Sequence, residues 1–446
     1  MRSPLFPLFF AFAACSAHNR FEESEGGSAG DDGGLVGDLD GSSSGCTTTV
    51  SGIVFDPAGK NPLYGIAVYV PGAPLKPLAT GASCYACEDL YSGEPVSTAI
   101  TDASGKFTLG KAPSGPNVPI VVQIGKWRRR TWIPDVKACQ DNPQPAGSLR
   151  LPRNHNEGDM PSIAISTGGA DSLECLLSRV GIDASEFVGG PGGSGRVHVF
   201  KGGDDGSTPA ANTPSPGPAS AQALWPSKAA LMPYDVVLLG CEGHETDSVN
   251  RQALYDYAEA GGRVFASHFH YTWFNAGPFG AANLASWKTG SNAIGDIKSD
   301  IVKTLPNNKP FPKGIALEQW LGNVGALVGG ELPITTAKHN ANIAAAHTNS
   351  QAWILAAPSS PAPGAAQYFS FDTPFAAPPT GKCGRGVYSD MHVGAASGDY
   401  PGPRIVPNGC AQKALSPQEA ALEFMLFDLS SCLKPDDQPP KPPAPK

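Results

Sequence analysis

Between Cys46 and Pro152 the chain consists of short runs of alternating apolar and polar residues, rich in β-branched side chains and separated by turn residues. Examples are "TTTVSGIVFD", "YGIAVYVPG", "VSTAITDASGKFTLG" and "VPIVVQIGKWRRRTWIPDV". A two-residue period places alternate side chains on opposite faces of a strand. Several such strands with turns between them predict a small all-β sandwich over residues 46–152.

From Met160 the pattern changes to alternating strands and helices. Continuous apolar runs such as "PSIAIST", "YDVVLLG" and "RVFAS" predict buried strands. In "GGADSLECLLSRVGID", Asp171 and Glu174 stand at the positions of a capping box. The helix that follows places four apolar side chains on one face, namely Leu173, Leu176, Leu177 and Val180. A last helix begins at "SPQE", with a Ser cap, Pro in the first turn and Glu at the boxed position.

Alternating strands and helices indicate a parallel sheet that helices cover on both faces. The sequence therefore predicts a multidomain protein, an all-β sandwich followed by a doubly wound (flavodoxin-like) α/β domain over residues 153–433. Residues 201–230 and roughly 275–350 interrupt the alternation, so we expect loops or a cap over one edge of the sheet there.

The two ends of the chain have a different character. Residues 1–15, "MRSPLFPLFFAFAAC", have the layout of an export signal, too short to span a bilayer. Their small residues before Cys15 resemble a bacterial lipobox, which implies a lipid on Cys15 and an N-terminal membrane anchor. Residues 16–45 read as a flexible, disordered tether and residues 434–446 as a Pro-rich tail. We expect an exported cell-envelope protein, at the outer membrane or surface of a Gram-negative bacterium.

The composition of the chain restricts the classes of molecule that it could bind. The formal net charge is -8 and the isoelectric point is about 5.6, which argues against nucleic acid as a partner. In "KWRRRTW", alternation places Trp127 and Trp132 on opposite faces of a strand, beside arginines. One face suits a sugar ring or an acidic surface, and the alternative is that the Arg stems cover the sandwich.

Ten cysteines agree with export, because most cysteines outside the cytosol are oxidised. Without Cys15 nine remain, so at least one is unpaired within the chain. The pair in "CYAC", Cys84 and Cys87, has the spacing of a redox centre or of half a zinc site, but no second CxxC follows, so we expect structural disulfides with Cys46 and Cys139 instead. Cys383 and Cys410 flank the segment after His392, and we expect them to pair and hold that segment.

Polar side chains follow three of the predicted strands where each strand ends. Since the carboxyl ends of parallel strands meet at one edge of a sheet, we expect these side chains to form one site. The strand "VVLLG" is followed by Glu242, His244 and Glu245, "RVFAS" by His268 and His270, and "GRGVY" by Asp390 and His392.

The chemistry of this cluster stays open. His268, His270, His392 and Asp390 suit Zn or Fe, because imidazoles and a carboxylate ligate both ions. Acid–base catalysis without a metal, a non-catalytic pocket and structural hydrogen bonding are the alternatives. The neighbouring Tyr271, Trp273 and Phe274 favour a flat ligand such as a sugar, or simply mark burial.

The sandwich resembles the carboxypeptidase regulatory-like domain, a transthyretin-like fold grouped with carbohydrate-binding-like folds. The likeness rests on "VSGIVFDPAGKNPLYGIAVYV" and "TDASGKFTL". In the second stretch Asp102 closes the turn through its side chain and Gly105 supplies the left-handed residue. Such a domain is an accessory module without protease chemistry of its own.

The second domain resembles the class I glutamine amidotransferase-like fold, especially its trehalose-utilisation (ThuA-like) branch. The likeness rests on "YDVVLLG", "DYAEAGG", "FASH" and "GRGVYSDMH". Amidotransferases place a nucleophilic Cys at the elbow after the strand, where this chain has His268. Cys241 lies at the end of a different strand, so the resemblance does not imply a Cys–His hydrolase.

These observations together predict a cell-envelope lipoprotein with a non-catalytic ligand-binding role and no cofactor. The expected binding residues are Glu242, His244, His268, His270, Trp273, Asp390 and His392, with a polysaccharide or cell-surface glycan as the candidate ligand. The alternative is a hydrolase or metal-dependent enzyme of the amidotransferase-like fold that acts on carbohydrate-like substrates.

Overall fold

The structure of this protein is a computed structural model that describes residues 46–446 apart from 86, 204–209, 212–218, 247–248, 394–398 and 402–404. The predicted signal, the lipidation site Cys15 and the tether lie outside the described residues. The described residues all belong to one compact unit. Among the described helices, none combines the length and the apolar character that a membrane span requires.

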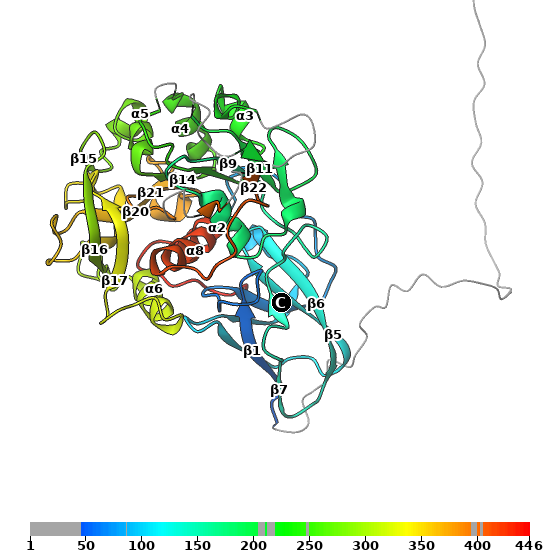
Figure 1. Ribbon diagram of the computed structural model, residues 1–446. Coiled ribbons are helices and arrows are strands. Elements are labelled where there is room, and N and C mark those ends of the chain that lie inside the picture. Colours follow the sequence, from blue (N-terminus) through cyan, green and yellow to red (C-terminus); the bar gives the residue numbers. More distant parts are fainter. Residues whose placement is uncertain are drawn as a thin grey trace, which may run out of the picture. The chain divides into compact units, whose positions relative to one another are not determined.

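The predicted sandwich is present as two small sheets (Figure 1). One has the order β4–β1–β7, with β8 also paired to β1, and the other has the order β3–β2–β5–β6. The turn before β4 forms as expected, because Asp102 Oδ1 accepts hydrogen bonds from the backbone N–H of Ser104 (2.8 Å) and Lys106 (3.0 Å). Gly105 there has a φ of +71°. The elements are β1 (Thr49–Phe55), β2 (Ala67–Pro71), α1 (Cys87–Leu90), β3 (Pro95–Ile100), β4 (Lys106–Gly110), β5 (Gly115–Ile124), β6 (Trp127–Val136), β7 (Asp141–Pro143) and β8 (Leu149–Arg150).

The α/β domain is built on a ten-stranded sheet with the order β10–β11–β9–β13–β14–β21–β20–β19–β16–β17. Pairing from β10 to β21 is parallel, and pairing from β21 to β17 is antiparallel. The strands are β9 (Ile163–Ser166), β10 (Phe187–Gly189), β11 (Val197–Phe200), β13 (Val236–Leu239), β14 (Arg263–Ser267), β16 (Ala293–Ile301), β17 (Leu332–Lys338), β19 (Ser350–Ala356), β20 (Ala366–Thr373) and β21 (Gly384–Ser389).

The expectation that residues 275–350 form only loops or a cap is wrong. This segment contributes β16 and β17, which extend the sheet, and the helix α6 (Pro312–Asn323). The sheet is therefore mixed, and only its first six strands are parallel. In β16 the side chains of Ile297, Ser299 and Ile301 are buried and those between them are exposed, a one-sided pattern that suits antiparallel pairing.

Helices cover both faces of the sheet (Figure 1). Alternate residues of β13 divide between two cores: Val236 and Leu238 pack with α2 and α8, and Val237 and Leu239 pack with α3 and α4. The first of these cores continues without a break into the sandwich. The remaining elements are α2 (Leu173–Arg179), η1 (Ala184–Glu186), β12 (Ala210–Ala211), η2 (Ala221–Ala223), α3 (Lys228–Leu231), α4 (Arg251–Glu259), η3 (His268–Trp273), α5 (Gly277–Ala281), β15 (Ser286–Trp287), β18 (Ala341–Asn342), η4 (Pro379–Gly381), β22 (Ile405–Val406) and α8 (Pro417–Ser430).

Of the two predicted capping boxes, one forms. At the start of α8, Ser416 and Glu419 bond to each other's backbone N–H as expected. The box of Asp171 and Glu174 is wrong: the N-cap of α2 is Ser172, and no side chain caps it. Both carboxyl groups are instead buried against the segment that follows β21, where Asp171 accepts a hydrogen bond from the N–H of Val393 and Glu174 from the hydroxyl of Tyr400.

The disulfides join distant segments. Cys46 pairs with Cys139, Cys84 with Cys383, Cys87 with Cys432, and Cys175 with Cys410. The predicted Cys383–Cys410 bond is therefore wrong, and so is the pairing of Cys84 and Cys87 with Cys46 and Cys139. The reason is tertiary: the loop that carries Cys84 and Cys87 leaves the sandwich and packs on the α/β domain, where Ala82 N–H donates to the carbonyl of Met232 at 2.9 Å. Four disulfides indicate an exported protein.

The Pro-rich C-terminal segment lies on the body of the protein. Lys434 pairs with Glu88, Asp437 pairs with Lys309, and the N–H of Lys446 donates to the carbonyl of Pro95 at 2.7 Å. The tail therefore contacts both the sandwich and the α/β domain.

Candidate functional site

The predicted location of the site follows from three neighbouring parallel strands. β13, β14 and β21 pair in register, with Leu239 opposite Ala266 and Ser267 opposite Ser389. Their carboxyl ends therefore meet at one edge of the sheet, and the chain segments that carry Glu242, His268 and Asp390 leave from that edge. This is the arrangement that the sequence predicts for a ligand site in an α/β sheet.

At this edge three side chains converge. The Sγ of Cys241 lies 3.3 Å from Nδ1 of His268, and the ring centroids of His268 and His392 are 5.0 Å apart. One potential ligand atom from each of the three residues lies within 4.8 Å of the others, and all three side chains are buried. Among the described residues, this is the one group of three or more His, Cys, Asp or Glu residues with metal-ligand spacing.

His268 stands at a sharp elbow. It follows β14 directly and begins the 3-10 helix η3, with a φ of +42° that non-glycine residues rarely adopt. Its Nε2 lies 2.9 Å from the carbonyl of Ser291. A carbonyl only accepts, so Nε2 carries the proton and Nδ1 presents a lone pair to Cys241.

His392 completes the cluster with an unpaired nitrogen. Its Nε2 is buried and has no hydrogen-bond partner. The backbone around it is held on two sides, because Gln418 donates to the carbonyl of His392 at 2.6 Å and Asp171 accepts from the next N–H at 2.8 Å. The backbone that carries the imidazole is thus fixed in place, while the ring Nε2 has no protein partner.

Burial keeps these groups neutral in the protein alone. It raises the pKa of the Cys241 thiol to about 12 and lowers the pKa of His268 to about 4. Burial also lowers the pKa of His392 well below its usual value. The Cys241–His268 contact is therefore a thiol–imidazole hydrogen bond and not a thiolate–imidazolium pair.

The expectation that His270 joins His268 is wrong. The Nε2 of His270 lies 2.9 Å from the carbonyl of Gly240, and its Nδ1 accepts from Nε1 of Trp273 at 3.1 Å. Both ring nitrogens are thus used in structural bonds. Side chains two residues apart point to the same side only in a strand. Here β14 has already ended, and the 3-10 helix η3 directs the imidazole of His270 away from that of His268. Trp273 is buried and packs edge to face on Trp225.

Asp390, Glu242 and His244 are not part of the Cys241–His268–His392 cluster. Asp390 accepts from the hydroxyl of Tyr388 and from the N–H of Asn340, each at 2.7 Å, and burial raises its pKa to about 7. Glu242 is buried, with one oxygen bonded to Thr246 at 2.6 Å and the other unpaired. His244 is exposed. Asp390 therefore fixes the neighbouring loop rather than polarising the histidines.

Sequence reasoning missed Cys241 as a member of the site. The signal was present in the pairing of the two strands: Leu239 of β13 lies opposite Ala266 of β14, so Cys241 stands two residues further on, at the position opposite His268. Asp171 was also not predicted as a residue near the site. It is fully buried, its Oδ2 has no hydrogen-bond partner, and its charge raises the pKa of Cys241.

Comparison with known proteins adds little. No protein-family model matches the chain, and no curated protein matches it. Matches to solved structures include an N-terminal and a C-terminal interface mutant of the type II cohesin–X–dockerin complex from Acetivibrio cellulolyticus. Both are 16% identical and cover 30% and 31% of this chain and 85% and 74% of the other, with TM-scores of 0.18 and 0.16. Such low TM-scores identify neither the fold nor the function.

Proposed function

We propose that the α/β domain binds a transition-metal ion, with Zn²⁺ as the best fit, through Cys241, His268 and His392. The observation that carries the proposal is the convergence of three buried ligand atoms within 4.8 Å, each from the end of a different strand. Thiolate and imidazole are the ligands that Zn²⁺ prefers, whereas Mg²⁺ and Ca²⁺ prefer oxygen.

The donor set fits such an ion. Zinc bonds of about 2.3 Å to sulfur and about 2.0 Å to nitrogen require ligand atoms roughly 3.3 to 3.7 Å apart. The Sγ–Nδ1 distance of 3.3 Å already meets this. The bond from Nε2 of His268 to the carbonyl of Ser291 is the outer contact that fixes the tautomer of a metal-bound histidine. The unpaired Nε2 of His392 would gain a partner.

The role proposed is metal binding rather than metal-dependent hydrolysis. Cys241, His268 and His392 are 0%, 2% and 5% exposed, so the ligands are shielded from water. A hydrolytic zinc keeps a coordination position that water and substrate reach.

Cobalt substitution tests the proposal. Protein loaded with Co²⁺ is expected to bind about one ion per chain, with an intense thiolate-to-cobalt absorption band. Cys241→Ser should remove the band, and His268→Ala and His392→Ala should weaken binding at least about tenfold. His244→Ala, at an exposed position beside the same edge, is the matched control. A wild-type protein that binds no stoichiometric metal, or a Cys241→Ser variant that binds it as well, would overturn the proposal.

A second candidate function rests on the sandwich. Trp132 on β6 is 52% exposed, and the Arg130 guanidinium lies 5.2 Å from its ring centroid. An exposed indole supported in this way suits stacking on a sugar ring, so we propose glycan binding at this surface. Trp132→Ala should abolish retention on insoluble polysaccharide, whereas Val328→Ala, at another exposed apolar residue, should not. Equal retention of the two variants would exclude Trp132 as the contact.

For the cell we propose a lipid-anchored envelope protein whose domains belong to the carboxypeptidase regulatory-like and amidotransferase-like folds. The two small sheets and the parallel strands with an elbow at His268 support the fold assignments. The sequence "AFAAC" supports the anchor. Cys15→Ala should release the protein from membranes, and a variant that still sediments with them would contradict the anchor.

A further inference from the structure

A second site lies at the junction of the sandwich and the α/β domain. A cavity of about 220 Å³ separates the turn after β1 from the start of α8. This volume is far more than one or two water molecules require. The lining includes Asp56, Lys60 and Asn61 from the sandwich, Arg179 from α2, and Lys413 and Ser416 from the segment that leads into α8.

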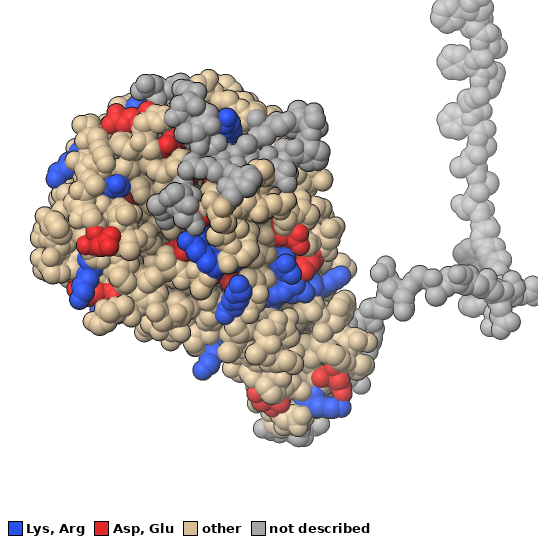
Figure 2. All heavy atoms as spheres, viewed as in Figure 1, with Lys and Arg blue, Asp and Glu red and all other residues tan. Residues whose placement is uncertain are grey.

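The cavity lining contains more cationic than acidic residues. Three of its lining residues, Lys60, Arg179 and Lys413, are cationic, and only Asp56 is acidic. Burial raises the pKa of Asp56, which favours its uncharged form. Figure 2 shows several Lys and Arg side chains around the middle of this face, between the regions where Figure 1 places α8 and β1.

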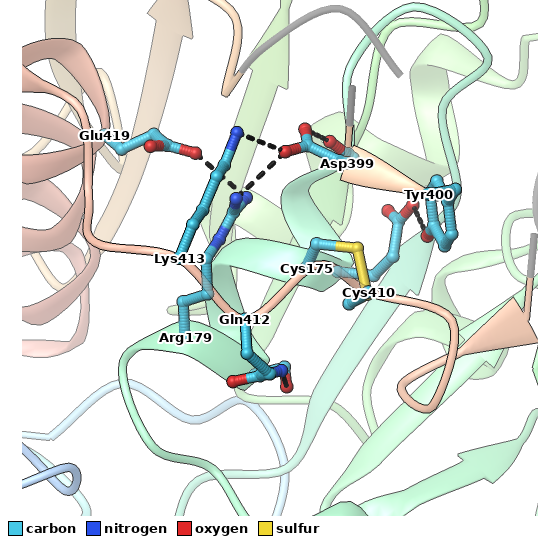
Figure 3. The surroundings of a disulfide bond; sticks show 11 residues. Cys175, Arg179, Asp399, Tyr400, Cys410, Gln412, Lys413 and Glu419 are labelled. Carbon is cyan, nitrogen blue, oxygen red and sulfur yellow. Dashed lines mark hydrogen bonds and ion pairs between the residues drawn. A yellow bond between two sulfur atoms is a disulfide. The ribbon is translucent and has the colours of Figure 1, made fainter. Parts of the chain in front are cut away.

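Arg179, one of the lining residues, has a buried donor without a hydrogen-bond partner. Its side chain is 1% exposed, and its guanidinium contacts Oδ1 of Asp399 and Oε1 of Glu419, each at 2.9 Å (Figure 3). The Nε has no hydrogen-bond partner. A buried guanidinium N–H without an acceptor is costly, and an anion in the cavity would supply one.

The other two positive contributions come from different parts of the chain. Lys413 pairs with Asp399 at 2.8 Å, and its side chain is 43% exposed. Lys60 is exposed and belongs to the sandwich. The first turn of the 14-residue helix α8 adds the positive end of its dipole, with Ser416 and Pro417 in the cavity wall.

We propose that this cavity binds a small multiply charged oxyanion, a phosphate or sulfate group, between Lys60, Lys413 and the Nε of Arg179. Since Lys60 comes from the sandwich and the other two from the α/β domain, the bound anion bridges the two domains and stabilises their association. The inference is independent of the metal site, because the two sites share no residue.

Thermal unfolding in increasing inorganic phosphate tests the inference, with sodium chloride at equal ionic strength as the reference. The full chain should show a saturable rise in Tm with phosphate, and sulfate should act in the same way. Lys60→Ala should raise the Kd for phosphate about tenfold, since one charge-assisted contact is lost. Lys106→Ala is the matched control, since Lys106 is an exposed lysine of the same sandwich outside the cavity.

Lys413→Gln provides a second variant, although the loss of its bond to Asp399 also affects stability. The side chain of Lys60 forms no ion pair of this kind, so the Lys60→Ala variant should fold as the wild type does. Its phosphate response therefore decides the test. A Tm that rises no more in phosphate than in chloride would overturn the inference. So would a phosphate response in Lys60→Ala that equals the response of the Lys106→Ala control.

Discussion

The thiol of Cys241 lies 3.3 Å from Nδ1 of His268, although 27 positions separate the two residues in the chain. Two neighbouring parallel strands bring them together, because each residue follows the end of its own strand. The elbow after β14 carries the imidazole, and the neighbouring strand end carries the thiol.

His270 is expected to be structural. Replacing His270 with Ala leaves the carbonyl of Gly240 and the indole N–H of Trp273 without partners in a buried position. Each loss costs about 1 to 3 kcal/mol, so the free energy of unfolding should fall by roughly 2 to 6 kcal/mol. Urea unfolding measures this, with the exposed His244→Ala as the control. A loss below about 0.5 kcal/mol would show that the hydrogen bonds contribute nothing.

The disulfide between Cys84 and Cys383 should stabilise the junction of the two domains. It links residues 299 positions apart, and its removal in Cys84→Ser/Cys383→Ser is expected to lower the free energy of unfolding by about 4 kcal/mol. Peptide mapping without reduction checks the connectivity, and chemical unfolding checks the stability. Recovery of a Cys383–Cys410 peptide would reject the connectivity described above.

The buried ion pair of Lys126 and Asp235 also joins the domains. The two charged atoms are 2.5 Å apart, with side chains 6% and 9% exposed. Lys126→Met leaves the buried Asp235 carboxylate without a cation, which should lower the free energy of unfolding by about 3 to 5 kcal/mol. Adding Asp235→Asn should recover part of that loss. A double variant as unstable as the sum of the single variants would mean that the two groups do not interact.

Stability should fall as the pH rises from 6.5 to about 8. Burial raises the pKa of Glu174 to about 8 and that of Asp171 to about 7. A carboxyl group with a raised pKa stabilises the fold fully below its unfolded pKa of about 4.5 and loses that contribution as the pH approaches its folded value. The buried histidines have lowered pKa values, so they oppose this trend only below pH 6.5.

Glu174→Gln tests this pH dependence. The amide keeps an acceptor for Tyr400 and does not ionise, so the decrease of stability with pH should become shallower. One group contributes a slope of at most about 1.4 kcal/mol per pH unit. Unfolding by urea across the window measures the slope, and Glu318→Gln, at a half-exposed carboxylate paired with Lys303, is the control. Parallel pH profiles for wild type and Glu174→Gln would refute the assignment to Glu174.

Much of the architecture was readable in the sequence because it depends on neighbouring residues. The alternation in "TTTVSGIVFD" and the apolar run "VVLL" specify strands, and the side chain of Asp102 closes its own turn. The rule that parallel strands end at one edge predicted where His268 and His392 meet. Each of these features needs only a period, a turn residue or the order of elements.

What the sequence left open depends on contacts between segments far apart. Cys383 pairs with Cys84 because a loop of the sandwich reaches the α/β domain, and no spacing along the chain encodes that approach. His270 turns away because the strand ends one residue before His268. The cavity between Lys60 and Lys413 exists only where two domains meet. Local pattern determined the strands and the edge that carries the site, whereas long-range packing alone decided which side chains converge there, since that depends on how the segments are placed in space.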